Sequence, residues 1–473
     1  MADLKKMFSY LPEVRKPEEK KVSFNVKLKW TLIILVIFFV LSDIPLWGLS
    51  VNALQRFEFL ATILGADFGS LISLGIGPIV MASIILQLLV GAKILQIDTS
   101  TVEGKKFFQG LQKVLVLVFI VFEAVVYVAM GGLGSDPALG MFGVYMLIFQ
   151  LILGGLAIVL MDDVTQKWGF GSGVSLFIGA GVSKQIIVSA FQFVNSEGRN
   201  CLLDFQNTPC SGQVFVLIQS IINQTPIEFM AAASMLIVTV LIFLLVVFAQ
   251  SLKVEIPLSF GRIRGYNIKW PLAFFYASVI PVILVAALIA NLQLFGGMLQ
   301  NWLQHPTILG NFVDGIPVCT AEGCGLAFWL GSTNLLDLVI RGGVLPIYFW
   351  QGLTHTLFFM GGAIIFSIFW VKTSGLDTRS QAEKIIASGL QVSGFRQDER
   401  VLETILDRYI MPLTVMGGAA IGLLASLTNL FGGLVSGTAI LLVIMIMYQF
   451  YQNIAQQHAV DMHPAMRKFM GNS

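Results

Sequence analysis

Long apolar runs, separated by short polar segments, dominate the chain. A helix of roughly 20 apolar residues crosses the ~30 Å hydrocarbon core of a bilayer. Runs of about this length predict ten membrane-spanning helices. They lie near Trp30–Trp47, Gly75–Leu95, Val114–Met130, Met141–Leu160, Val174–Phe193, Met230–Leu252, Trp270–Leu294, Pro346–Val371, Pro412–Leu430 and Thr438–Tyr451. No long alternation of apolar and polar residues is present, which argues against a β-barrel.

The composition agrees with this pattern. Of the 473 residues, 56% are hydrophobic and only 12% are charged, about half of the roughly 25% that is usual in soluble domains. A soluble globular protein is therefore excluded. Residues 1–29 mix charges and contain no apolar stretch, so we expect no cleavable signal peptide. The fold class is an all-α polytopic membrane protein.

The basic residues fall on one side of the predicted spans. Of the 29 Lys and Arg residues, 25 lie in the two terminal segments and in loops on the same side, and only Arg56, Lys184, Arg199 and Arg341 lie on the other. Lys and Arg accumulate in cytoplasmic loops, so both termini are predicted to be cytoplasmic.

Ten spans divide into two halves of five. An odd number in each half turns the second half upside down relative to the first, as in transport proteins built from inverted repeats. The predicted parts are a cytoplasmic N-terminal segment 1–29, an N-terminal half 30–194, an external hinge loop 195–212, a C-terminal half 213–452 and a cytoplasmic tail 453–473.

The four cysteines occupy two predicted external loops. Cys201 and Cys210 share one loop, and Cys319 and Cys324 share the other. Local pairing within each loop fits an oxidising compartment, and free thiols are the alternative. A metal site is less favoured, because His305 is the only imidazole nearby.

Residues 54–74 interrupt the pattern of spans. A short amphipathic stretch ends at Gly65, Asp67 and Gly69, and a backbone break at Leu74–Pro78 precedes the second span. The stretch is either a helix on the outer membrane surface or a re-entrant helix in a cavity between the halves. Irregular backbone at membrane depth requires surrounding protein or water.

Two polar residues lie inside predicted spans. A carboxylate such as Glu123 costs about 2.5–3.5 kcal/mol at the centre of a membrane, so Glu123 should face protein or water. Asn291 is the second buried polar candidate. The two residues either bind helices together or mark a helix interface that opens.

Glycine-rich stretches at Gly169–Gly173 and Gly418–Gly422 lack the surroundings of a phosphate-binding loop, and we expect close helix packing at both. No arrangement of nucleophile, base and oxyanion donor is present, so neither an enzyme nor a cofactor site is predicted. Two basic cytoplasmic loops, 250–270 and 371–409, form a plausible contact for an anionic partner such as ribosomal RNA.

The run Leu74–Leu89, Leu-Gly-Ile-Gly-Pro-Ile-Val-Met-Ala-Ser-Ile-Ile-Leu-Gln-Leu-Leu, resembles the second span of the SecY/Sec alpha-subunit family. The similarity extends over essentially the full length and is nearer to archaeal and eukaryotic members than to bacterial ones. The other matching stretches, in family order, are Leu11–Val14, Gly169–Gly173, Gly261–Gly265, Thr373–Asp377 and Pro412–Met416.

The resemblance implies a protein-conducting channel, the Sec translocon, in which two five-helix halves surround an hourglass pore. It assigns an aliphatic pore ring to Ile76, Val80, Val174, Ile178, Ile283 and Leu442. It assigns a plug helix within residues 55–67 to Phe57, Leu60, Ala61 and Leu64, which favours the re-entrant alternative. It assigns a lateral gate to Met81, Glu123 and Asn291, with Met81 in place of the family's small hydroxyl residue. It assigns ribosome docking to Arg262, Arg264 and Arg396.

The implied partners are a SecE/gamma subunit, a small beta subunit, the translating ribosome, signal peptides and nascent chains, and membrane lipid. We therefore expect the pore-forming subunit of a cell-membrane protein translocase that also releases apolar segments into lipid. A secondary transporter of a small solute is the alternative. It would require a polar site at the midplane, where the mapped ring is aliphatic.

Overall fold

The computed structural model of the chain describes most of the predicted spans and loops. The described residues are 13–18, 22–49, 69–91, 94–95, 97, 101–129, 133–195, 199–203, 205, 208–260, 267–277, 280–303, 305–313, 316–320, 323–387, 390–392 and 399–462. The plug residues 55–67 and the three docking arginines, Arg262, Arg264 and Arg396, lie outside this set.

Ten helices correspond to the ten apolar runs, so the prediction of an all-α polytopic membrane protein is confirmed. They are α2 (Phe24–Asp43), α4 (Gly77–Gly91), α5 (Val102–Ala129), α6 (Gly140–Trp168), α7 (Gly173–Phe191), α9 (Pro226–Ser251), α10 (Ile280–Leu303), α13 (Pro346–Thr373), α15 (Glu399–Phe431) and α16 (Gly437–Met462). Among the described residues, nine helices are long and apolar enough to cross a membrane. The tenth, α4, has 15 residues, or about 22 Å of helix.

The predicted seventh span begins too early. Trp270 is part of strand β2 (Asn267–Ala273), which pairs antiparallel with β1 (Lys253–Phe260), with Ile256 opposite Trp270. The membrane helix starts only at Ile280. Strand β7 (Leu390–Val392) joins the other edge of β1, which gives the order β2-β1-β7. The two predicted basic loops therefore meet in one small sheet.

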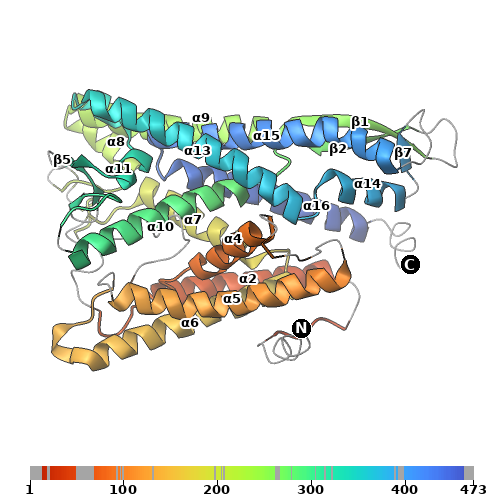
Figure 1. Cartoon of the computed structure of the whole chain (residues 1–473). Coiled ribbons are helices and arrows are strands. Elements are labelled where there is room, and N and C mark those ends of the chain that lie inside the picture. Colours follow the sequence, from red (N-terminus) through yellow and green to blue (C-terminus); the bar gives the residue numbers. More distant parts are fainter. Residues whose placement is uncertain are drawn as a thin grey trace.

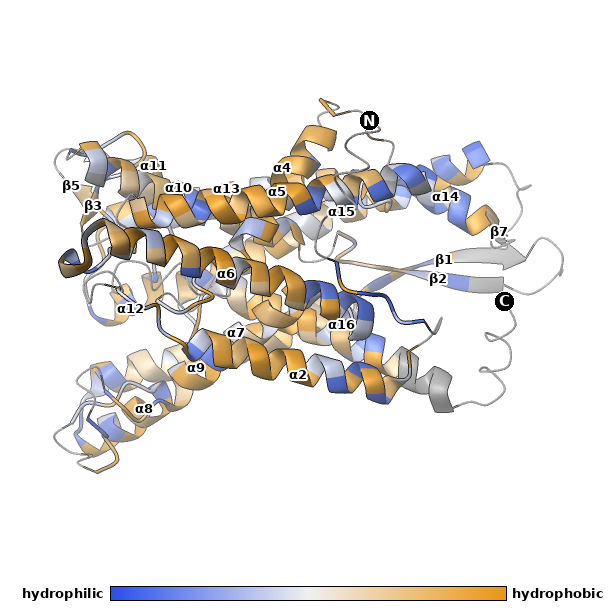
Figure 2. Cartoon of the chain, turned by 90° about the horizontal axis from the view of Figure 1, so that it is seen from below, coloured by the Kyte–Doolittle hydropathy of each residue, from blue (hydrophilic) through white to orange (hydrophobic). Residues whose placement is uncertain are grey.

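The helices form two groups with a central layer between them. Figure 1 shows α2, α5 and α6 on one side and α9, α13 and α15 on the other, with α4, α7 and α10 between. In α10, 56% of the most apolar stretch is buried, against 17% in α2. Because lipid replaces water around the outer helices, their exposed side chains are apolar, as Figure 2 shows along α2 and α6.

Small residues bring α13 and α15 together, as predicted for Gly418–Gly422. A Cβ atom on Gly418 would lie 2.6 Å from Ser367 Oγ, and one on Gly422 would lie 2.8 Å from the Cα atom of Met360. Close backbone approach of this kind is the usual basis of helix packing in membranes.

Short elements cover one end of the bundle. They are η2 (Pro137–Leu139), α8 (Gln213–Ile222), α11 (Leu326–Leu330), α12 (Leu335–Ile340), and two hairpins of strands β3 (Phe312–Val313) with β4 (Ile316–Pro317) and β5 (Cys319–Thr320) with β6 (Gly323–Cys324). Cys201 forms a disulfide with Cys210, and Cys319 forms one with Cys324, across Cα separations of 5.3 and 4.4 Å.

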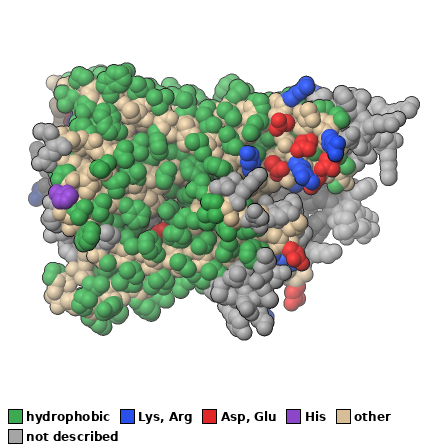
Figure 3. All heavy atoms as spheres, viewed as in Figure 1, with side chains coloured by type: hydrophobic (Ala, Val, Ile, Leu, Met, Phe, Trp, Pro, Cys, Tyr) green, Lys and Arg blue, Asp and Glu red, His purple; other side chains and the backbone are tan. Residues whose placement is uncertain are grey.

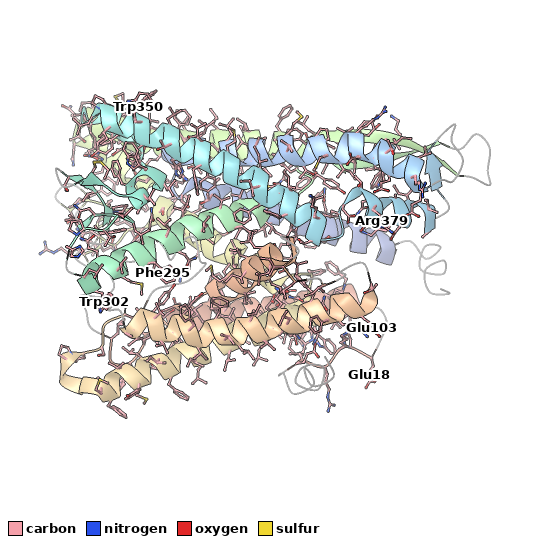
Figure 4. The ribbon with its side chains drawn as sticks, viewed as in Figure 1. Glu18, Glu103, Phe295, Trp302, Trp350 and Arg379 are labelled. Carbon is pink, nitrogen blue, oxygen red and sulfur yellow. A yellow bond between two sulfur atoms is a disulfide. The ribbon has the colours of Figure 1, made fainter. Side chains whose placement is uncertain are left out.

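Charged side chains gather at the opposite end. Figure 3 shows an apolar surface over the length of the helices and a cluster of basic and acidic side chains at one end. Helix α14 (Thr378–Ala387) lies there. In Figure 4, Glu18, Glu103 and Arg379 lie at this end, whereas Trp302 and Trp350 lie at the other. Both tryptophans are exposed, as is common where a protein surface meets lipid headgroups.

Candidate functional site

The chain enters α4 through an irregular segment that is enclosed by protein. Residues 71–76 form turns, and Gly75 has a positive φ of 53°. The Ile72 and Leu74 side chains are fully buried. On α6, a Cβ atom on Gly154 would fall on the carbonyl oxygen of Leu71. The predicted backbone break is therefore confirmed, and it lies among packed helices rather than in lipid, as its polar groups require.

The six predicted ring residues belong to one apolar cluster. Four are buried, with exposures of 1% for Ile76, 8% for Val80, 1% for Ile178 and 3% for Leu442. The other two, Val174 and Ile283, are partly buried and pack against the same cluster. They come from residues 76–80 at the start of α4 and from α7, α10 and α16, so four separate parts of the chain contribute to this cluster.

A cavity of about 330 Å³ adjoins this cluster. Four of the ring residues line it, namely Val80, Val174, Ile178 and Ile283. Nine of its other lining residues are polar and come from α4, α5, α6, the start of α7 and the end of α13. These polar residues are Ser83, Gln87, Gln112, Asp162, Gln166, Ser172, Ser175, Thr373 and Ser374. This cavity, the vestibule, therefore has a mixed lining, in which these polar side chains lie beside the ring residues and beside Ile79, Phe108, Ile280, Leu284 and Trp370.

The polar vestibule residues were not predicted as functional. Gln87 interrupts the apolar run of α4, and Gln112 precedes that of α5, so a search for amides in and beside the spans would have found them. In the structure, Gln112 Nε2 donates a hydrogen bond to Ser83 Oγ at 2.6 Å. This bond joins α5 to α4.

The predicted gate residues are only partly brought together. Asn291 Nδ2 on α10 lies 3.3 Å from Met81 Sδ on α4 and donates to Ala287 O at 2.7 Å. Glu123 on α5 is buried, and its Oε2 atom accepts no hydrogen bond from any described residue. Among these residues, no hydrogen bond links Glu123 to Met81 or Asn291. Met81 and Asn291 therefore mark a contact between α4 and α10, to which no hydrogen bond among the described residues ties Glu123.

The glycine-rich stretch before α7 serves close packing, as predicted. A Cβ atom on Gly173 would lie 2.6 Å from the Cα atom of Asp162, and one on Gly169 would lie 2.7 Å from Thr165 O. Helix α7 can therefore start directly against α6. Its first two turns carry Val174 and Ile178.

The fold and this site define a class: a multi-pass membrane protein whose helices enclose a vestibule with aliphatic side chains from several helices in its wall. The family model of SecY matches residues 70–451. The protein translocase subunit SecY of Methanothermobacter thermautotrophicus is 43% identical over 470 residues, which cover 98% of either chain.

Two solved structures share the architecture. One is a SecY protein whose plug domain stabilises the closed state of the translocation channel and maintains a membrane seal. It is 36% identical, has a TM-score of 0.79 and matches 97% of this chain and 98% of its own. The other is Sec61 in the canine ribosome-channel complex from the endoplasmic reticulum, 36% identical with a TM-score of 0.77 and the same coverage. The chain belongs to the SecY family of protein translocase subunits, which are channels and not enzymes.

Proposed function

We propose that the chain is the pore-forming subunit of a Sec translocase and that polypeptides cross the membrane through the constriction. The observation that carries this proposal is the meeting of four aliphatic ring residues, Val80, Val174, Ile178 and Ile283, in the wall of the vestibule, with Ile76 and Leu442 in the same apolar cluster. An unfolded chain enters a wet vestibule easily, and the aliphatic ring accepts side chains of any chemistry because it makes no directional contacts.

The ring also restricts leakage. A constriction lined by aliphatic side chains loses its water and blocks ions by dewetting. The plug, assigned to Phe57, Leu60, Ala61 and Leu64, adds a second seal. The SecY structure named above supports this assignment, because its plug domain is described as maintaining a membrane seal.

The lateral gate opens between α4 and α10. The contact of Asn291 with Met81 is the one weak polar link at this interface that the described residues provide, at 3.3 Å. A nascent segment of about 20 apolar residues is more stable in hydrocarbon than in an aqueous pore. Such a segment leaves sideways once α4 and α10 separate, and Glu123 tunes how readily they do so.

The two halves, residues 30–194 and 213–452, are joined by the external loop 195–212. The charged end, with the β2-β1-β7 sheet, faces the cytoplasm, because Lys and Arg are retained on that side. Both termini lie there, and the protein resides in the cell membrane. The two disulfides then lie outside, where an oxidising environment preserves them.

Arg262, Arg264 and Arg396, which follow β1 and β7 in the sequence, are the proposed contacts with a translating ribosome. Support comes from the canine Sec61 ribosome-channel complex, whose channel has the same architecture. Because arginines bind phosphates through charge-assisted hydrogen bonds, ribosomal RNA is the expected contact. A SecE/gamma subunit and a small beta subunit complete the complex.

The test is crosslinking of a stalled secretory nascent chain to photoreactive probes at Val80 and Ile283, with a probe at lipid-exposed Val36 as the control. We expect adducts at the two ring positions and none at Val36. A secondary transporter predicts no nascent-chain adduct at any of the three positions. If no adduct forms at either ring position and the protein shows saturable uptake of a small solute, the channel proposal is wrong.

A further inference from the structure

Two successive carboxylates near the end of α6 face different neighbours. Asp163 receives the N-terminal segment, because its Oδ2 atom accepts a hydrogen bond from Val14 N at 2.7 Å. Asp162 lines the vestibule instead. The two residues differ in surroundings although they are neighbours in the sequence.

Asp162 holds the start of α7. Its Oδ1 atom accepts a hydrogen bond from Val174 N at 3.0 Å, and its Oδ2 atom accepts one from Gln166 Nε2 at 2.8 Å. The cap that α7 itself supplies is weaker, since Ser172 Oγ lies 3.5 Å from Ser175 N. The first turn of α7 thus depends on a side chain from another helix, and Gly173 permits the close approach.

We propose that Asp162 is a positioning residue for the pore constriction. A carboxylate at a helix N-terminus satisfies free N–H groups and interacts favourably with the helix dipole. Here it fixes Val174, which is the second residue of α7 and a member of the ring. Ile178, one turn later, is set by the same contact. This inference rests on the proposed function, because it assigns Asp162 to the seal of that pore.

Loss of the contact should loosen the ring without unfolding the helix. Further along α7, Phe177 stacks on Phe38 of α2 with ring centroids 4.9 Å apart, and α7 also packs against α16. These contacts do not involve Asp162. The first turn can therefore fray, move Val174 out of the constriction and admit water, while the remainder of α7 stays in place.

The experiment measures ion conductance through the full chain, reconstituted with its partner subunits in planar bilayers, before and after addition of a signal peptide. The variants are Asp162→Ala, Asp162→Asn and, as matched control, Asp163→Ala. For Asp162→Ala we expect a rise of roughly tenfold in the resting open probability, which corresponds to about 1.4 kcal/mol. Asp162→Asn keeps an oxygen acceptor for Val174 N and should stay within about twofold of the unchanged protein.

Asp163→Ala should lower the thermal stability, because it removes the partner of Lys167 and Val14, yet leave the resting conductance unchanged. Equal leakage in the two alanine variants would overturn the proposal, as would leakage in Asp162→Asn equal to that in Asp162→Ala. If the protein without substitutions shows no rise in conductance after a signal peptide is added, the proposed channel function itself is contradicted.

Discussion

At the scale of single residues, the proposed pore is built from side chains whose types are those of ordinary packing. Ile178 and Ile158 are both 1% exposed and belong to the same apolar cluster. Only Ile178 also lines the vestibule. Ile178 therefore differs from Ile158 in that one side of it borders a cavity, whereas Ile158 does not line that cavity.

This difference gives a testable prediction. Ile178→Ser should hydrate the constriction and raise the resting ion conductance by roughly tenfold, because a polar wall removes the dewetting barrier. Ile158→Ser places the same hydroxyl in closed packing, where an unpaired polar group costs about 1–3 kcal/mol, and should lower only the melting temperature. Single-channel recording and thermal denaturation in detergent separate the two effects. Similar conductance in both variants would refute the special role of Ile178.

A second prediction concerns the glycine that supports the irregular segment before α4. Gly154→Ala would place a methyl group on the carbonyl oxygen of Leu71, and overpacking of this kind costs about 1–3 kcal/mol. Gly361→Ala is the matched control, since a Cβ atom there meets nothing within 4 Å and alanine favours a helix more than glycine does. Thermal denaturation should show a lower midpoint for the first variant and an equal or higher one for the second.

At the scale of elements, the N-terminal segment is attached to the ends of α5 and α6 by charge. Glu13 Oε1 lies 2.9 Å from Lys113 Nζ and 3.2 Å from Lys167 Nζ. Trp168 Nε1 donates a hydrogen bond to Arg15 O at 3.0 Å. The segment therefore joins two helices of one half at the end where the vestibule opens.

The attachment should depend on pH. The hydrogen bond from Lys113 holds the pKa of Glu13 below its ordinary value, so the ion pair stabilises the bound segment above about pH 4.3, the usual Glu pKa. This contribution is lost as the pH falls through the lowered pKa. The protection of residues 13–18 against hydrogen exchange, taken relative to the intrinsic amide rate at each pH, should fall at acidic pH. Glu13→Gln should lower this protection already at pH 7 and weaken its pH dependence, and unaltered protection in this variant would contradict the assignment.

The elements differ in how far the sequence predicts them. Apolar runs locate the membrane helices because a spanning segment must satisfy all its backbone hydrogen bonds internally. The β1–β2 hairpin was missed, although Val254, Ile256 and Leu258 alternate with polar residues as a half-buried strand requires. Helix α8 was missed because ten residues are too few to form a span.

At the scale of the whole molecule, the constriction could not be derived from residue patterns alone. Its members are separated by up to several hundred positions in the sequence. Each is an apolar residue in an apolar run, which is equally typical of a residue that faces lipid or packs in the core. Resemblance to a family supplied the set, and the structure then placed all six members in one cluster. Asp162 escaped notice for the same reason, since its partner Val174 lies across a turn between two helices.

The proposed lateral gate is the one interface at which the molecule must open as two bodies. Helix α4 packs against α5, which belongs to the same proposed half, and against α10 and α13, which belong to the other proposed half. Separation of the halves therefore breaks the contacts of α4 with α10 and α13 and preserves those with α5. A covalent link between α4 and α10 should hold the gate closed.

The variant Met81→Cys/Asn291→Cys tests this directly, because all four native cysteines are already paired and the two new thiols replace side chains whose atoms lie 3.3 Å apart. Joining them with a short bifunctional reagent should reduce membrane insertion of an apolar nascent segment at least tenfold, and reduction should restore it if the reagent is cleavable. The matched control is Thr239→Cys/Leu434→Cys, which links two positions of the same proposed half. In the unsubstituted protein, Leu434 N donates a hydrogen bond to Thr239 Oγ1 at 2.9 Å. The control should insert normally. Normal insertion through the linked α4–α10 pair would mean that apolar segments leave by another route.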